Sequence, residues 1–174
     1  MPNYKTKLLS PMSNGRFHNI LNATKDLRKK AFFVLLYYYC PRVTEAINLK
    51  RKQFWEDGGY LVLDVGKRLK RSKTTKPLML PKRKLGVKDL ILYLGTFHDP
   101  DLILFPINRK TAWNWCHKFK IYPHYFILSR ITKFLSAPGG KGISAAQAWT
   151  GKHIRTLQNY AGQVDIKEIA DGID

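Results

Sequence analysis

The pattern of apolar and polar positions predicts a mostly α-helical protein with a small antiparallel β-hairpin or sheet. Residues 31–40 are almost all apolar, and apolar side chains recur at helical spacing through residues 43–49. We expect Asp26 to cap the first of these helices, because an aspartate side chain can accept from the free N–H groups of a first turn. A second helix is expected over residues 41–50, with Pro41 in its first turn.

The hairpin prediction comes from the middle of the chain. A turn signal at residues 57–59 precedes a run of aliphatic and β-branched side chains at residues 60–65, and a short returning strand follows at residues 77–81. Residues 66–76, between the two strands, contain six Lys or Arg side chains and no acidic one. The expected hairpin therefore has a strongly cationic tip.

Helical patterns, separated by breaks that contain glycine or proline, account for most of the remaining chain. The expected helices cover residues 16–24, 87–94, 111–119, 125–135, 144–150 and 154–161. Residues 1–15 contain Pro, Ser, Asn and Gly, and we expect a flexible arm or linker there. One domain is expected over residues 16–162, followed by an acidic, amphipathic tail segment at residues 163–174.

Charge directs the functional interpretation toward polyanions. The 174 residues include 31 Lys or Arg and 12 Asp or Glu, for a formal net charge of +19, while 44% hydrophobic residues predict a folded core. Such a charge is unfavourable in a compact fold unless a polyanion offsets it, and nucleic acid is the first candidate. A membrane is a weaker candidate, because the longest apolar run, residues 31–40, is well short of the ~20 residues that span a bilayer.

The reactive side chains show no metal or nucleotide site. Cys40 and Cys116 lie in apolar or aromatic surroundings without metal-ligand spacing, so we expect two reduced core cysteines. The chain contains no Walker-type loop and no paired carboxylates at metal spacing, so no cofactor is expected. Residues 1–30 are polar and basic, which predicts a cytoplasmic, DNA-associated protein rather than a secreted one.

Arg42 stands at the junction of the two expected helices. A guanidinium keeps its charge, so a partly buried one needs an anionic partner. Glu45, three residues later, is one candidate, and a phosphate is the other.

Four blocks, taken in order, resemble the tyrosine recombinase (phage integrase) family. Residues 42–49, Arg-Val-Thr-Glu-Ala-Ile-Asn-Leu, are similar to its first arginine box, and residues 66–76 resemble the loop that carries its lysine. Residues 124–135 resemble His-x-Leu-Arg-His-Thr-Phe-Ala-Thr-x-Leu-Leu. Residues 149–160 resemble Leu-Gly-His-x-x-Ile-x-Thr-Thr-x-x-Tyr, with one residue fewer between Gly and Tyr.

The resemblance implies a DNA recombinase that uses neither metal nor nucleotide and forms a 3′-phosphotyrosyl intermediate. Tyr160 matches the nucleophile, and Arg42 would bind the scissile phosphate. Lys67 is the first choice for the lysine that protonates the leaving 5′-oxygen, with Lys70 and Lys73 left open. His124 would orient the site. After Gly151, either Lys152 or His153 could donate to a phosphate oxygen.

The family pattern breaks at Ile127, where the second catalytic arginine is expected. Arg130 lies one turn later on the same helical face and is the candidate replacement, although DNA backbone or a carboxylate are alternative partners for it. Losing one donor to a developing negative charge can slow a reaction by about 10²–10³. The alternative function is therefore a DNA-binding module with weak or no chemistry.

The other implications concern partners and scope. The residues expected to contact DNA are Lys70, Arg71, Lys73, Lys76, His153 and Arg155. Members of the family act on double-stranded DNA as homo-oligomers, so a tetramer on DNA is expected. The tail at residues 163–174 would dock on a neighbouring subunit or, alternatively, pack on its own core. No block resembles the family's N-terminal core-binding domain, so we expect a catalytic domain or a fragment. The boxes look less like those of a type IB topoisomerase, a basic RNA-binding protein is the fallback, and the composition is compatible with an archaeal virus or plasmid.

Overall fold

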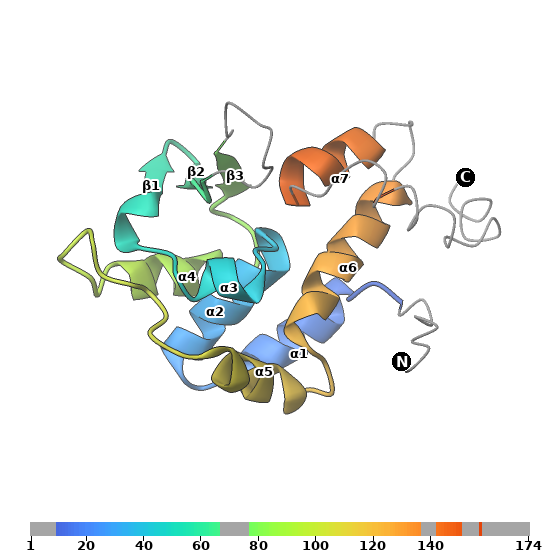
Figure 1. Cartoon of the computed structure of the whole chain (residues 1–174), viewed down its shortest axis with the longest axis horizontal. Coiled ribbons are helices and arrows are strands. Elements are labelled where there is room, and N and C mark those ends of the chain that lie inside the picture. The colour runs from blue at the N-terminus through green and yellow to red at the C-terminus, as the bar shows by residue number, and fades with distance from the viewer. Residues whose placement is uncertain (1–9, 67–76, 137–141, 151–156, 158–174) are drawn as a thin grey trace.

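The computed structural model describes residues 10–66, 77–136, 142–150 and 157 (Figure 1). These residues form a mostly helical fold with a small three-stranded antiparallel sheet at one side (Figure 1), and this is the fold class that the sequence predicts. The helices are α1 (Asn14–Ala23), α2 (Leu27–Tyr38), α3 (Val43–Ala46), the 3-10 helix η1 (Arg51–Gln53), α4 (Val87–Leu94), α5 (Arg109–His117), α6 (Pro123–Leu135) and α7 (Gly142–Thr150). The strands are β1 (Phe54–Asp57), β2 (Tyr60–Leu63) and β3 (Leu78–Pro81).

Helix α2 is the centre of the core. Its residues 31–38 are all buried, so the helix is apolar on every side, as is typical of a helix with neighbours all around it. It packs against α4 and α6, and Phe33 makes edge and stacked ring contacts with Phe119 and Phe126. Asp26 caps the helix as predicted, because its Oδ1 accepts from the Lys29 N–H at 3.1 Å.

The expected helix over residues 41–50 is much shorter in the structure. Helix α3 begins at Val43 and ends at Ala46, so Pro41 lies before the helix rather than in its first turn. The amide of Asn48 donates to the Thr44 carbonyl at 2.7 Å, and Leu49 then accepts from the distant Leu104 N–H at 2.9 Å. The helix ends early because backbone pairing with a remote segment replaces its next turn.

The predicted hairpin is confirmed, and a third strand joins it. Strands β2 and β3 are antiparallel, with Leu63 opposite Leu78. The sequence prediction missed β1, which pairs with β2 through the turn at Gly58 and Gly59. Only Phe54 of β1 is buried, so the strand lacks the apolar alternation that would have indicated it.

Several helices begin two residues earlier than predicted, because residues that satisfy the first turn precede their apolar stripe. The Ser13 hydroxyl accepts from the Arg16 N–H at the start of α1, and Asn108 caps α5 in the same way. Pro123 occupies the first turn of α6, where its missing N–H leaves no bond unmade. Helix α4 has the predicted bounds.

The end of the expected N-terminal arm is packed rather than flexible. Met12 is fully buried, and its N–H donates to the Ser129 hydroxyl at 2.7 Å. The Tyr125 hydroxyl donates to the Ser10 carbonyl at 2.7 Å. Residues 10–15 therefore belong to the folded body, because distant side chains on α6 satisfy their backbone. Residues 1–9, the tail at 163–174 and most of the expected helix 154–161 lie outside the described residues.

Candidate functional site

One pocket joins Arg42 to His124, two residues from distant sequence blocks. It has a volume of about 360 Å³ and lies where the starts of α3, α5 and α6 meet. We call it the Arg42 pocket; its lining residues are Arg42, Val43, Thr44, Arg109, Pro123, His124 and Ile127. Two guanidinium groups and an imidazole thus line the pocket, and no carboxylate is among its described lining residues, which is the composition of an anion site.

A strained turn positions Arg42. Cys40 has a φ of 50°, a left-handed conformation that side chains other than glycine rarely adopt. The Cys40 side chain is buried, and its Sγ contacts the Phe126 carbonyl of α6 at 3.8 Å. The turn therefore ends α2 sharply and places Arg42 at the N-cap of α3, beside the start of α6.

Glu45 accepts a hydrogen bond from the backbone N–H of Arg42 and makes only a long contact with the Arg42 guanidinium. One carboxylate oxygen accepts from the Arg42 N–H at 2.7 Å, while the other lies 3.9 Å from Nη1 of the guanidinium. The Arg42 side chain is 57% exposed, so it is less buried than the sequence suggested. A contact of this length at the surface contributes little, and the guanidinium keeps donors for an external anion.

Helix α6 brings His124 to the pocket and uses Ile127 for packing. His124 is exposed in the first turn of the helix. Ile127 is only 3% exposed and belongs to a small apolar cluster with Cys40, Ile131, Ala146 and Leu157. The side chain at the family's arginine position therefore stabilises the core beside the Arg42 pocket.

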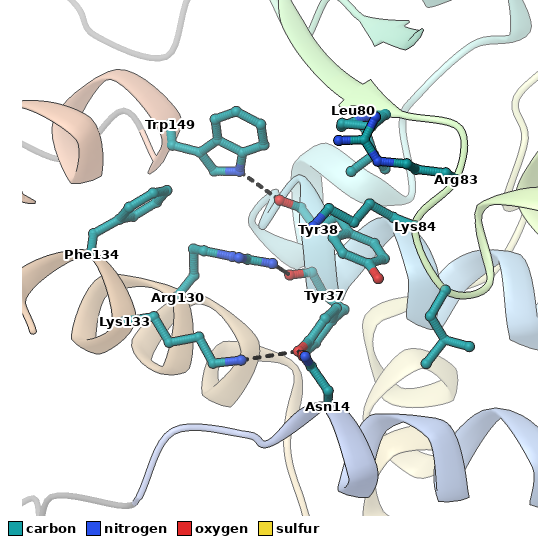
Figure 2. A pocket seen from close by; sticks show the side chains of 12 residues that line it. Asn14, Tyr37, Tyr38, Leu80, Arg83, Lys84, Arg130, Lys133, Phe134 and Trp149 are labelled. Atoms are coloured by element: carbon teal, nitrogen blue, oxygen red, sulfur yellow. Dashed lines mark hydrogen bonds between the residues drawn. The ribbon is translucent and has the colours of Figure 1, made fainter. Parts of the chain in front are cut away.

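Arg130, the predicted replacement, does not line the Arg42 pocket. It lies on another side of α6, where its Nη2 donates to the Tyr37 carbonyl at 2.8 Å and its guanidinium lies over the rings of Tyr37 and Tyr38 (Figure 2). Three residues advance a helix by about 4.5 Å and leave the side chain about 60° around the axis. That offset turns Arg130 toward α2 and away from His124.

Arg109 is the functional candidate that the sequence prediction missed. It is the first residue of α5, exposed to solvent, and it lines the Arg42 pocket. A usable signal was present, because Arg109 and Lys110 put two cations at a helix start, where the backbone dipole disfavours positive charge. An anion bound at that end offsets this repulsion.

Several predicted site residues lie outside the described part of the chain: Lys67, Lys70, Arg71, Lys73, Lys76, Lys152, His153, Arg155 and Tyr160. Two described residues, Gly66 and Leu157, lie next to these segments in the sequence. Gly66, which ends the described part of the hairpin, has a φ of 71° and donates its N–H to the Asp64 carboxylate at 2.8 Å. Leu157 is helical and fully buried in the cluster with Ile127.

The cysteines are buried free thiols, as predicted. Burial raises the pKa of Cys116 to about 12, so this thiol stays protonated and unreactive. Among the described residues, no group of three His, Cys, Asp or Glu side chains is arranged to hold a metal ion. No helix in this part of the chain has the length and apolar character needed to cross a bilayer.

Comparison with known proteins identifies the fold. No family model and no curated protein sequence matches this chain. The crystal structure of XerA recombinase matches with a TM-score of 0.66 and 19% sequence identity, over 98% of this chain and 64% of that one. XerH site-specific recombinase bound to difH substrate matches in its post-cleavage complex (TM-score 0.69, 14% identity, 96% of this chain and 54% of that one). Its pre-cleavage complex matches equally well (0.69, 16%, 96% and 53%).

This chain therefore spans only about half to two thirds of the length of the recombinases it matches. Over that length it has the fold of the tyrosine recombinase catalytic domain, which confirms the predicted fold class.

Proposed function

We propose that this chain, which has a tyrosine recombinase catalytic-domain fold, cuts and rejoins double-stranded DNA as a site-specific recombinase. The observation that carries the proposal is the pocket that Arg42 and His124 share, whose described lining residues include two arginines and no carboxylate. Arg42 comes from the end of the α2–α3 turn and His124 from α6, so only folding brings them together. A phosphodiester is the anion that this composition and the net charge of +19 suit best.

The proposed reaction is a reversible transesterification. The Tyr160 hydroxyl loses its proton to solvent as its oxygen attacks the scissile phosphorus, the bond to the 5′-oxygen breaks, and a 3′-phosphotyrosyl bond forms. The leaving 5′-oxygen takes a proton from a cationic acid, for which Lys67 is the first choice. Arg42 and His124 stabilise the negative charge that develops on the non-bridging oxygens. Rejoining is the same step in reverse, with a 5′-hydroxyl as the nucleophile.

Arg109 supplies the second guanidinium in this proposal. Ile127 occupies the position of the family's second arginine and is committed to the core, whereas Arg109 lines the same pocket from α5. Among the described residues Arg109 makes no ion pair, so its charge is available to a ligand. Arg130 was predicted as the second catalytic arginine, but it would have to give up its hydrogen bond to the Tyr37 carbonyl to reach the Arg42 pocket. We therefore do not assign Arg130 to the reaction.

The apolar cluster beneath the pocket supports the role of Tyr160. Leu157, three residues before Tyr160 in the sequence, is buried with Ile127 and Cys40. Leu157 is therefore packed in the same cluster as Ile127, which lines the Arg42 pocket. Assembly as a homo-oligomer on double-stranded DNA is part of the proposal, because the resemblance to tyrosine recombinases implies it.

The deciding experiment traps the covalent intermediate on a substrate pool that does not depend on the identity of the target site. A pool of random-sequence duplexes carries a 5′-bridging phosphorothiolate, whose thiolate leaves without acid catalysis and cannot rejoin efficiently. We expect a denaturant-resistant protein–DNA adduct with the unaltered chain and none with Tyr160→Phe. Tyr160→Phe removes one hydroxyl only, so unchanged DNA binding by this variant shows that the fold is intact.

A second candidate function is DNA binding without chemistry, and the buried Ile127 favours it. It predicts salt-dependent duplex binding. It also predicts no adduct on the phosphorothiolate duplex, either with the unaltered chain or with Ile127→Arg. That combination of results would reject the recombinase proposal.

A further inference from the structure

A second pocket lies between the turn that follows β3 and the helices α6 and α7, on the side of α2 that bears Tyr38 (Figure 2). We call it the Tyr38 pocket, and its volume is about 390 Å³, within the range of small-molecule sites. The residues that matter here are Tyr38, Arg83, Lys84, Arg130, Lys133 and Trp149. Among the described residues, no Asp or Glu lines it.

Four cations surround this pocket on two walls. Arg130 and Lys133 of α6 are held in place, because Arg130 donates to the Tyr37 carbonyl at 2.8 Å and Lys133 donates to the Tyr37 hydroxyl at 3.0 Å. Arg83 and Lys84 are exposed on the opposite wall. Within the described part of the chain none of the four forms an ion pair. Like charges gathered without a counter-charge repel one another, so a bound anion stabilises this arrangement.

Aromatic rings also line the pocket. The Trp149 indole Nε1 donates to the Tyr38 carbonyl at 2.5 Å, which fixes this ring at the pocket wall, with its centroid 6.2 Å from that of Phe134 (Figure 2). Tyr37 and Tyr38 lie in contact at 4.8 Å between ring centroids. Fixed aromatic faces next to cations are the combination by which proteins hold unpaired nucleotides.

The Tyr38 hydroxyl is the second observation that points to a ligand. Tyr38 is only 9% exposed, and among the described residues its hydroxyl makes no hydrogen bond. In Figure 2 this hydroxyl points into the space beside Lys84. Burial raises its pKa to about 12, so the group stays protonated and can donate to an acceptor at neutral pH. A buried donor that is left without a partner is costly, and a ligand that accepts from it removes that cost.

We propose that the Tyr38 pocket binds one unpaired nucleotide of single-stranded DNA. The phosphate lies between Arg83 and Lys84 on one wall and Arg130 on the other, and the base stacks on Trp149 with an acceptor facing the Tyr38 hydroxyl. A simple anion would leave the aromatic faces uncovered, and a duplex base has no exposed face to stack. The site is separate from the Arg42 pocket and requires no cleavage, so it stands whether or not the chain is a recombinase.

The test is fluorescence anisotropy with a short labelled oligothymidylate and the same oligonucleotide in abasic form. Arg83→Gln with Lys84→Gln is the pocket variant, and Lys25→Gln with Lys88→Gln is the matched control, with the same loss of charge at exposed positions outside the pocket. We expect the pocket variant to weaken binding about tenfold and to lower the salt slope by up to about 0.7, because the site neutralises one phosphate of a single strand. The control should change the dissociation constant less than twofold.

Two further measurements separate base recognition from charge. Tyr38→Phe, which keeps the ring, should weaken the oligothymidylate several-fold and leave the abasic form unchanged, and the unaltered chain should prefer the base-bearing form about tenfold. Tyr160→Phe should bind like the unaltered chain, so this site and the proposed reaction can fail separately. Equal affinity for the two oligonucleotides, or an equal loss in the control variant, would overturn the proposal. So would a synthetic peptide of residues 163–174 that binds this pocket while the oligothymidylate does not.

Discussion

The two pockets share helix α6 but present cations of different character. His124 and Ile127 face the Arg42 pocket, whereas Arg130 and Lys133 face the Tyr38 pocket. The Arg42 side chain is 57% exposed and makes one long contact with Glu45, while Arg130 is fixed by a backbone carbonyl and two rings. An arginine with unengaged donors can follow a charge that develops during a reaction, whereas a fixed arginine recognises a charge that is already present.

Helix α6 contributes side chains from different faces to the two pockets. Three residues along α6 separate Ile127 from Arg130, and this offset moves the side chain from one pocket to the other. A guanidinium cannot compensate for a loss at Ile127 simply by being close in sequence. Compensation comes more readily from a different element, such as the start of α5, whose first residue already lies in the pocket.

The largest effect is expected when Arg42 and Arg130 are replaced separately. Arg42→Ala should slow adduct formation by about 10²–10³, because a donor to the transition state is lost. Arg130→Ala should slow it less than about tenfold, while weakening oligothymidylate binding. Single-turnover trapping on the phosphorothiolate duplex measures the first effect and anisotropy the second. A loss in Arg130→Ala as large as that in Arg42→Ala would mean that the two pockets act as one site.

The next largest effect concerns Arg109 and Ile127. Arg109→Ala should slow adduct formation by about 10², and Arg109→Lys should recover part of the rate because the charge returns without the fork of donors. In the Arg109→Ala background, Ile127→Arg should restore activity if the new guanidinium reaches the same phosphate. Thermal unfolding must accompany this variant, since Ile127 is buried. Lys110→Ala, on the adjoining position of α5, is the control and should leave the single-turnover rate within about twofold.

Gly86 tests whether the Tyr38 pocket can be disturbed alone. It precedes α4 with a φ of 79°, and a Cβ there would lie 2.6 Å from Leu21 Cδ1 and 2.8 Å from Val34 Cγ2. Gly86→Ala should destabilise the fold by about 2–3 kcal/mol through strain and overpacking. At about 2–4 °C per kcal/mol, calorimetry should show a clearly lower Tm. Gly59→Ala is the matched control, because a Cβ at Gly59 meets no atom within 4 Å.

Gly86→Ala should also affect the two pockets differently. Gly86 follows Arg83 and Lys84 in the turn that forms one wall of the Tyr38 pocket. Below its Tm, Gly86→Ala should weaken oligothymidylate binding and leave adduct formation on duplex DNA nearly unchanged. Parallel losses of both activities would indicate that the turn supports the Arg42 pocket as well.

The smallest effect is a pH dependence at high pH. Burial, together with the neighbouring Tyr37, raises the pKa of Tyr38 from 10.0 to about 12, while the Arg130 charge acts in the opposite direction. A raised pKa in the folded state means that Tyr38 contributes stability that is complete below pH 10 and is lost as the pH rises toward 12. Denaturant unfolding should therefore show a fall in stability over this window that is shallower in Tyr38→Phe. Some fall should remain in that variant, because burial also raises the pKa of Tyr39.

Local sequence features predicted much of the fold because they act within a few residues. The Asp26 cap, the bounds of α4 and the hairpin of β2 and β3 follow from periodicity, capping chemistry and turn residues. The predictions failed where a distant partner replaced a local preference. Helix α3 ends early because Leu49 pairs with Leu104, and residues 10–15 are ordered because Ser129 and Tyr125 bind their backbone.

The amino-acid pattern was sufficient to predict the cationic character of this protein, most of its helices and its hairpin, and the presence of Arg42 and His124 in blocks like those of recombinases. Which charged side chains share a pocket depends on how the helices pack. The left-handed turn at Cys40, the rotation of α6 about its axis and the approach of the α5 start bring Arg42, His124 and Arg109 to one pocket and take Arg130 to another. Linear spacing specifies a helical face, but the neighbour of that face depends on how the whole core packs.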